Sequence, residues 1–299
     1  MNRVYDVEMS KFKEIYPPTF LYSSLTKLQI SECAYQLTKV QKQMLVKCAP
    51  RIIGLNGYFL SSIPKAAIKR ISNLESLKFE YMGRGYDKAH FDTLMKNNSR
   101  NIKNVFITQL NCFIFKPSCD KYTFIQLSSL TLHCELQSIA RSEDQWPYIV
   151  KFIDKCPNLQ ELHMPGVVIG AKIPTPNGKV KHLTVECSIY TNAVNAVNLM
   201  MSYSHSIEML TIYMLDDITI FYRDWFLPNV KHMTLKYPVG HGPTNIQKRC
   251  SIAPHFQEEV KIKEISLDRC YRKGLTPGCF PHSAIRPPHE FYGIRKGCS

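Results

Sequence analysis

The sequence predicts an α/β fold, a right-handed solenoid (horseshoe) with a parallel sheet on its concave face and irregular helices and loops on its convex face. Two observations predict it. A short frame of apolar residues recurs along most of the chain, and amphipathic segments separate many of its copies. The clearest copy lies in Cys156–Met164, where Leu159, Leu162 and Met164 are spaced as apolar-x-x-apolar-x-apolar.

The frame occurs ten times, and the interval between its central residues averages about 26 residues. Individual intervals range from 21 to 32 residues, which predicts an irregular array. Each copy is typical of a short strand that points alternate side chains into a core, and neighbouring units must stack because one unit cannot bury its apolar side alone. The ten copies are Leu25/Leu28/Ile30, Ile52/Leu55/Gly57, Leu74/Leu77/Phe79, Ile102/Val105/Ile107, Leu127/Leu130/Leu132, Leu159/Leu162/Met164, Val180/Leu183/Val185, Ile207/Leu210/Ile212, Val230/Met233/Leu235 and Ile262/Ile265/Leu267.

Four segments between copies carry apolar residues at helical spacing, which predicts amphipathic helices that return the chain to the next strand. Two other segments, 113–124 and 219–225, have weaker helical patterns and are predicted to be extended or single turns. The predicted helices cover residues 34–47, 87–97, 145–155 and 191–203.

The pattern divides the chain into three parts. Residues 1–24 contain no clear copy of the frame and are expected to form an N-terminal cap or to be the remnant of an upstream domain. The array of about ten irregular repeats covers residues 25–270, and its most loop-like insertion is 238–254, which contains Pro and Gly. Residues 271–299 contain four prolines and are predicted to be a C-terminal cap or a mobile basic tail.

Composition limits the class of protein. The chain has 299 residues, of which 44% are hydrophobic, so it is long enough to bury a substantial core. It has no run of about 18 apolar residues and its first residues carry charges of both signs, so we expect neither a membrane span nor a secretory signal peptide. The 11 cysteines include no C-x-x-C pair, which favours reduced thiols in the cytoplasm or the nucleus. A net charge of +14 favours an acidic partner, and nucleic acid is one candidate, although no block of five or six basic residues is present.

One join between segments resembles a known family. Residues 156–162, with the pattern C-P-N-L-x-x-L, resemble the join of cysteine-containing leucine-rich repeats of the ribonuclease-inhibitor-like type, which are common in F-box/LRR proteins. Residues 48–52, C-A-P-R-I, resemble it more loosely. The resemblance covers roughly 25–270 and implies repeats that recognise a protein substrate while an N-terminal F-box docks the chain onto a Skp1-cullin ubiquitin ligase. The sequence before Leu25 shows no recognisable F-box. We therefore expect either an F-box upstream of this chain or an array that binds on its own as an inhibitor or scaffold.

The strand positions between and beside the apolar positions are predicted to form the partner-binding surface, because they point away from the core on the concave side. They hold polar and aromatic side chains, a mixture that suits protein recognition, in which aromatic anchors carry much of the affinity. The alternative is that they are ordinary half-exposed strand residues. The candidate residues are Tyr58, Lys78, Tyr81, Phe106, His133, Glu161, His163, His182, Tyr213, His232, Lys236 and Tyr237.

Neither metal nor cofactor chemistry is expected. The histidines of this surface are predicted to be solvated imidazoles, because residues stepped across parallel strands diverge too far to share one ion. The cysteines and histidines near the C-terminus match no common zinc spacing. The sequence contains no nucleophile elbow, H-E-x-x-H motif, P-loop or kinase motif and no repeated pair of carboxylates, so it predicts a binding module and not an enzyme.

Overall fold

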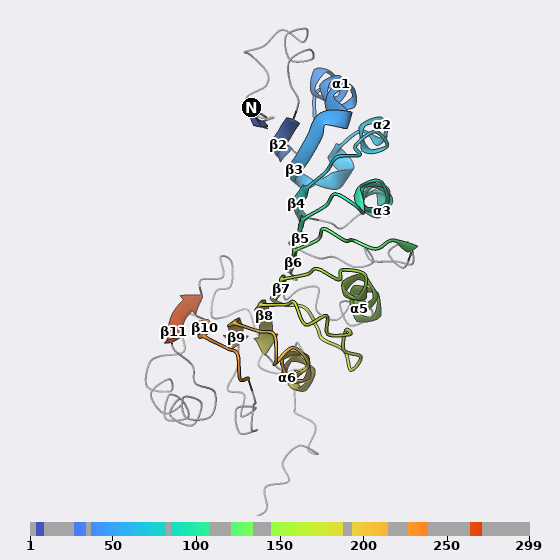
Figure 1. Ribbon diagram of the computed structural model, residues 1–299. Coiled ribbons are helices and arrows are strands. Elements are labelled where there is room, and N and C mark those ends of the chain that lie inside the picture. Colours follow the sequence, from blue (N-terminus) through green and yellow to red (C-terminus); the bar gives the residue numbers. More distant parts are fainter. Residues whose placement is uncertain are drawn as a thin grey trace, which may run out of the picture.

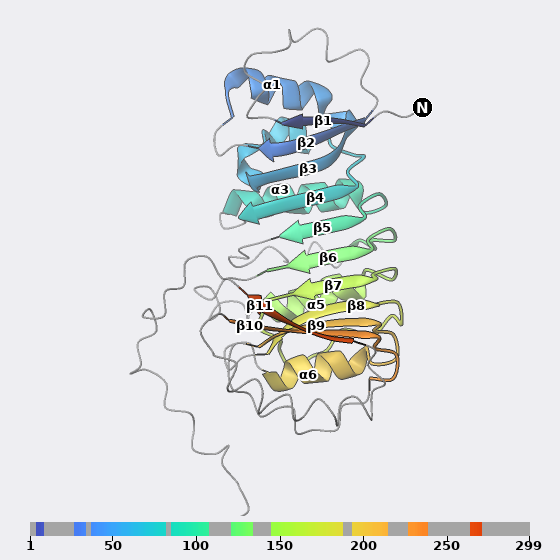
Figure 2. The same cartoon turned by 90° about the vertical axis from the view of Figure 1, so that its left-hand side faces the viewer.

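The computed structural model describes residues 4–8, 27–33, 37–81, 85–107, 121–133, 145–187, 193–214, 227–238 and 264–270. In these residues eleven strands form one parallel sheet in which each strand is hydrogen-bonded to the next in sequence (Figures 1 and 2). The strands are β1 (Val4–Glu8), β2 (Lys27–Cys33), β3 (Ile52–Phe59), β4 (Ser76–Tyr81), β5 (Asn104–Ile107), β6 (Ser129–Leu132), β7 (Glu161–Met164), β8 (His182–Cys187), β9 (Met209–Met214), β10 (His232–Pro238) and β11 (Glu264–Cys270).

Ten of these strands lie where the apolar frame predicts them, and the prediction of a parallel α/β architecture is confirmed. From β3 to β11 the central apolar residues of neighbouring copies stand opposite one another, as Leu77 does with Val105 and Leu130 with Leu162. Strand β1, which pairs with β2, was not predicted, because no copy of the frame was found in residues 1–24. Tyr5 stands opposite Leu28 and Val7 opposite Ile30, so the first apolar position of the frame falls on the polar Asn2.

The predicted register is wrong between β2 and β3. The frame aligns Leu28 with Leu55, whereas Ile30 stands opposite Leu55 and Cys33 opposite Gly57, with irregularities on both sides of the Ile30 pairing. Strand β3 has a glycine at positions 54 and 57, and glycine inside a strand is typical of bulges because it tolerates irregular backbone. An apolar frame records which side chains face the core and does not show where an extra residue is accommodated.

The core lies between the sheet and a row of helices on one of its sides (Figure 1). The first and central apolar residues of every copy from Ile52 to Met233 are buried. Together with the helices they form one continuous cluster that runs along the repeats, as stacked units require. The helices are α1 (Lys39–Cys48), α2 (Lys65–Ile68), α3 (Gly85–Asn98), α5 (Trp146–Asp154) and α6 (Ala193–Ser202), with 3-10 turns η2 (Ala49–Arg51) and η3 (Leu60–Ser62).

The four predicted helices are confirmed with shifted ends, and the short helix α2 was not predicted. Helix α1 begins at Lys39 because Thr38 caps it: the Thr38 hydroxyl accepts from the Gln41 amide, and the Gln41 side chain accepts from the Thr38 amide. The predictions for residues 113–120, 219–225, 239–254 and 271–299 lie outside the described residues and stay predictions. Within the part of the chain that the structure describes, no helix has both the length and the apolar character to span a bilayer.

Four asparagines, which we call the asparagine ladder, link neighbouring repeats at the edge where the strands begin. Each directly precedes the first apolar residue of its repeat, and its Nδ2 donates to a backbone carbonyl two residues before the first apolar residue of the preceding repeat. These bonds give carbonyl groups in the turns a hydrogen-bond donor, and they fix one repeat against the next. They run from Asn73 to Pro50 (2.7 Å), Asn101 to Ser72 (2.9 Å), Asn158 to Ile125 (2.6 Å) and Asn229 to His205 (2.5 Å).

A second edge contact is electrostatic. Glu208 lies between Lys231, whose Nζ is 2.7 Å from Oε2, and Lys181, whose Nζ is 2.9 Å from Oε1. Hydrogen bonds from these two lysines lower the pKa of the Glu208 carboxyl to about 2. Three consecutive repeats are therefore joined by one carboxylate.

We expect Glu208→Gln to lower the thermal unfolding midpoint slightly at pH 7, because the group is exposed and solvent screens its pairs. The folded pKa lies below the ordinary value of 4.5, so the carboxylate stabilises the fold above that pH and its contribution is lost as pH falls toward 2. The difference between wild type and variant should shrink from pH 7 to pH 3 and in 1 M salt. A difference independent of both pH and salt would contradict this role.

Candidate functional site

The sheet side opposite the helices faces the viewer in Figure 2. It carries polar side chains, and we call it the polar face. It follows from strand geometry, since residues between the buried apolar positions point to the other side of the sheet. Strands β6 and β7 show this alternation of half-buried and buried residues directly. The polar face consists of the described residues Asn56, Ser76, Lys78, Asn104, Phe106, Ser129, Thr131, His133, Glu161, His163, Pro165, His182, Thr184, Glu186, Met209, Thr211, Tyr213, His232, Thr234 and Lys236.

Two lysines of the polar face lie over aromatic rings on neighbouring strands. Lys78 of β4 stands opposite Phe106 of β5, and its Nζ is 5.0 Å from the ring centroid. Lys236 of β10 stands opposite Tyr213 of β9, at 5.4 Å. Both distances are within the range of cation–π attraction. The two pairs lie on either side of the middle strands β6 to β8, and each adds an aromatic surface with a positive charge.

Between them, β7 and β8 hold a cluster of titratable groups. His163 Nδ1 is 2.7 Å from the Thr184 hydroxyl oxygen, and His182 Nδ1 is 3.5 Å from a Glu161 carboxylate oxygen. The other Glu161 oxygen is 4.0 Å from His163 Nε2. Burial lowers the pKa of His163, Glu161 acts in the opposite direction, and His182 lowers it further. The net shift favours the neutral form of the His163 imidazole.

This cluster changes the prediction of solvated imidazoles. His163 is half-buried and hydrogen-bonded to a neighbouring strand, because the register places it directly opposite Thr184. The sequence places both residues on the same surface but does not predict their contact. His182 conforms better to the prediction, since more than a third of its side chain is exposed.

Strand β8 differs from its neighbours on the polar face. Thr184 and Glu186 occupy positions predicted to be exposed, yet both are buried. Beside them, burial raises the pKa of the Cys187 thiol to about 12, with a further contribution from the Glu186 charge. Burial therefore favours the protonated form of this thiol. The accessible part of the polar face is interrupted at the end of β8.

The structure brings seven of the twelve candidate residues into three groups: the two lysine–aromatic pairs and the Glu161, His163 and His182 cluster. His133 follows β6 and is half-buried, and His232 is exposed at the start of β10. Neither belongs to these groups. The side chains of Tyr58, Tyr81 and Tyr237 lie outside the described residues, although their backbones lie in β3, β4 and β10.

Met209 is a surface residue that the candidate set omitted. It stands opposite His182 on one side and His232 on the other, and 45% of it is exposed. The signal was present in the sequence, since methionine occupies a position of the frame that is otherwise polar or glycine in the described strands. An exposed, flexible apolar side chain among polar ones is typical of binding surfaces.

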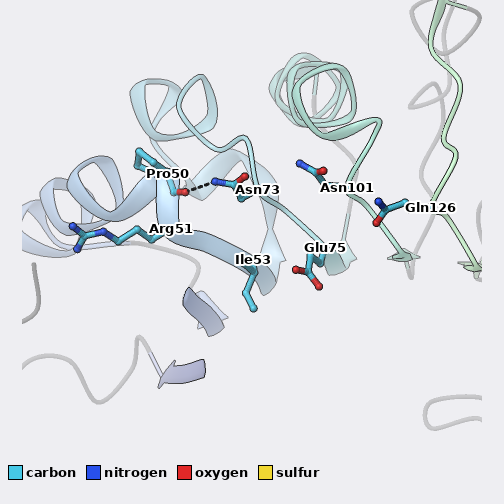
Figure 3. A pocket seen from close by; sticks show the side chains of 7 residues that line it. All are labelled: Pro50, Arg51, Ile53, Asn73, Glu75, Asn101 and Gln126. Atoms are coloured by element: carbon cyan, nitrogen blue, oxygen red, sulfur yellow. Dashed lines mark hydrogen bonds between the residues drawn. The ribbon is translucent and has the colours of Figure 1, made fainter. Parts of the chain in front are cut away.

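A shallow pocket lies at the edge where β3 to β6 begin (Figure 3). Pro50, Arg51, Ile53, Asn73, Glu75, Asn101 and Gln126 line it. Two of these residues, Asn73 and Asn101, belong to the asparagine ladder, and Lys103 Nζ is 2.8 Å from Glu75 Oε2. The polar groups that line the pocket therefore hold neighbouring repeats together, and this structural role accounts for their presence there.

Within the part of the chain that the structure describes, no three or more His, Cys, Asp or Glu side chains are placed to hold a metal ion. Cys48, Cys156 and Cys187 are buried free thiols. Neither a protein-family model nor a curated protein sequence matches this chain.

Proposed function

We propose that this chain is a right-handed, horseshoe-shaped leucine-rich repeat solenoid of the ribonuclease-inhibitor-like type and that it acts as a non-catalytic protein-binding module. The recurrence of the apolar frame, in register from β3 to β11, supports the repeat assignment. The helices lie on one side, and near β9 to β11 the strand stack turns toward the other side (Figure 1). This arrangement favours a concave polar face as the surface that receives the partner.

The observation that carries the proposal is the pairing of aromatic rings with lysines on the polar face. Phe106 and Tyr213 each offer a large, half-exposed ring held in place by a neighbouring cation. Aromatic anchors with polar surroundings are the usual energetic centres of protein interfaces. The exposed Met209 adds an adaptable apolar contact near the β9 pair.

The test is a comparison of captured partners between wild type and a double variant, Phe106→Ala with Tyr213→Ala, in quantitative cross-linking. We expect the double variant to retain at least tenfold less of each protein that the wild type captures, because removing an anchor costs about 2 kcal/mol or more of binding free energy. Ile125→Ala is the matched control, since Ile125 is an exposed apolar residue in a turn that is not on the polar face. Equal retention by wild type and double variant would refute binding through this face.

We further propose that the binding module is the substrate-recognition part of an F-box-type ubiquitin ligase. The support is the resemblance of residues 156–162 to the repeats of F-box/LRR proteins. Purification of the full-length protein from its own cells should then recover Skp1 and a cullin. Recovery of a binding partner without either protein would favour a stand-alone inhibitor or scaffold.

A nucleic-acid adaptor is the second candidate, favoured by the net charge of +14. Its test is the salt dependence of binding to a pool of single-stranded RNA. Saturable binding at physiological salt with a steep salt slope would support it, and shallow, unsaturable binding would exclude it.

A further inference from the structure

A second surface lies on the helix side of the sheet, away from the polar face. Residues 37–74 contain seven Lys or Arg residues and no Asp or Glu. They form α1, β3 and α2, and both helices pack on the side of the sheet opposite the polar face (Figure 1). The positive charge of the chain is therefore concentrated here by local sequence.

Two adjoining hollows between α1, α2 and α3 share Lys42 and Pro64 and together form what we call the lysine groove. Five lysines line it, and no aspartate or glutamate does. All five are exposed. They are Lys39, Lys42 and Lys47 from α1, Lys65 from α2, and Lys69 just after it.

Between the lysines the groove is apolar. Val46, Ile63, Pro64 and Ile68 contribute to its lining. Val40, one turn before Gln43 on α1, is 53% exposed and extends this apolar surface beyond the groove. A ligand that fills the groove must therefore combine negative charge with apolar side chains.

The groove is held in shape by hydrogen bonds between its walls. Arg70 Nη1 donates to the Val46 carbonyl oxygen of α1 at 3.0 Å, and Asn97 Nδ2 of α3 donates to the Lys69 carbonyl oxygen at 3.3 Å. His90 Nδ1 is 3.3 Å from the Leu60 carbonyl oxygen. A preformed groove lowers the entropic cost of binding.

Four of the five groove lysines are available to a ligand. Lys39, Lys42, Lys65 and Lys69 form no ion pair with any residue that the structure describes. Concentrated positive charge disfavours the folded state, and this cost is relieved when an anionic partner binds.

From these observations we infer that the lysine groove binds an acidic amphipathic peptide segment of a partner protein. The lysines would pair with its carboxylates while the partly exposed Val46 and Pro64 receive its apolar side chains. Single-stranded nucleic acid fits less well, because bases stack best on large aromatic rings and no Phe, Tyr or Trp is among the residues that line the groove.

The test is selection of a displayed library of random 12-residue peptides on the folded full chain, followed by affinity measurements with the enriched peptides. We expect these peptides to combine Asp or Glu with apolar residues. Their affinity should fall at least tenfold for Lys42→Glu with Lys69→Glu and less than twofold for the control, Lys121→Glu with Lys172→Glu. The control pair is also exposed and carries the same charge change, but it does not line the groove.

Three outcomes would overturn the inference. The first is enrichment of acidic peptides that bind both double variants equally. The second is enrichment only of peptides without acidic or without apolar residues. The third is a uridine 12-mer RNA that binds the groove more tightly than the best peptide and loses binding with the Lys42 and Lys69 changes. The Phe106→Ala and Tyr213→Ala changes should leave peptide binding unaltered, so failure of this inference is distinct from failure of binding through the polar face.

Discussion

Replacing Leu162 with Asp is expected to unfold the chain or lower its free energy of unfolding by more than about 4 kcal/mol. Leu162 is the central apolar residue of β7, is 0% exposed and lies in the continuous core. A carboxylate there would lose its hydration, and the lost packing would affect both neighbouring repeats, whose central residues Leu130 and Leu183 stand directly opposite. Circular dichroism during heating and urea titration measure the effect.

The matched control is Gln160→Asp. Gln160 lies two residues earlier, and its side chain is exposed, so the same charge enters solvent at low cost. We expect a change within about 0.5 kcal/mol for this variant. A Leu162→Asp protein that unfolds at the wild-type midpoint would refute the assignment of Leu162 to the core.

Replacing Asn98 with Ala is expected to cost about 3 kcal/mol, although no large apolar group is removed. Asn98 is the last residue of α3 and is 0% exposed. Its Oδ1 accepts from the Leu74 amide at 2.7 Å, and its Nδ2 donates to the carbonyl oxygens of Ile71 at 3.1 Å and Leu94 at 2.8 Å. The side chain thus ties the end of α3 to the turn that leads into β4, and its loss leaves buried backbone groups unpaired.

Asn97→Ala is the control for this prediction. The neighbouring side chain is half-buried and donates one hydrogen bond of 3.3 Å, so we expect a loss near 1 kcal/mol or less. Urea unfolding of both variants at equal protein concentration measures the difference. If both substitutions lower the free energy of unfolding equally, the buried hydrogen bonds of Asn98 stabilise the fold no more than the single bond of Asn97.

The strands and the core could be predicted from the sequence because side-chain alternation is a local property. Leu159, Leu162 and Met164 already showed which side of β7 is apolar, and the same reasoning identified nine further strands. It failed at β1, where the first apolar position of the frame falls on Asn2, and between β2 and β3, where the two glycines of β3 accompany a shifted register. A local pattern does not determine where a neighbouring strand gains an extra residue.

The candidate site was predicted only as a set of positions. The sequence identified Lys78 and Phe106 as surface residues, but their pairing follows from the register between β4 and β5. The asparagine ladder was visible as an asparagine before the first apolar residue, as in Asn158, yet its meaning depends on a carbonyl 33 residues away. The lysine groove likewise combines α1, α2 and α3, whose packing no single segment encodes.

By itself the sequence determined a parallel α/β array, its buried residues and its polar face, because each depends on alternation within about six residues. Tertiary structure alone decided which polar side chains meet. His163 reaches Thr184 only because β7 and β8 pair in one particular register. The frame aligns the two strands, but the contact between these side chains forms only when the strands stack.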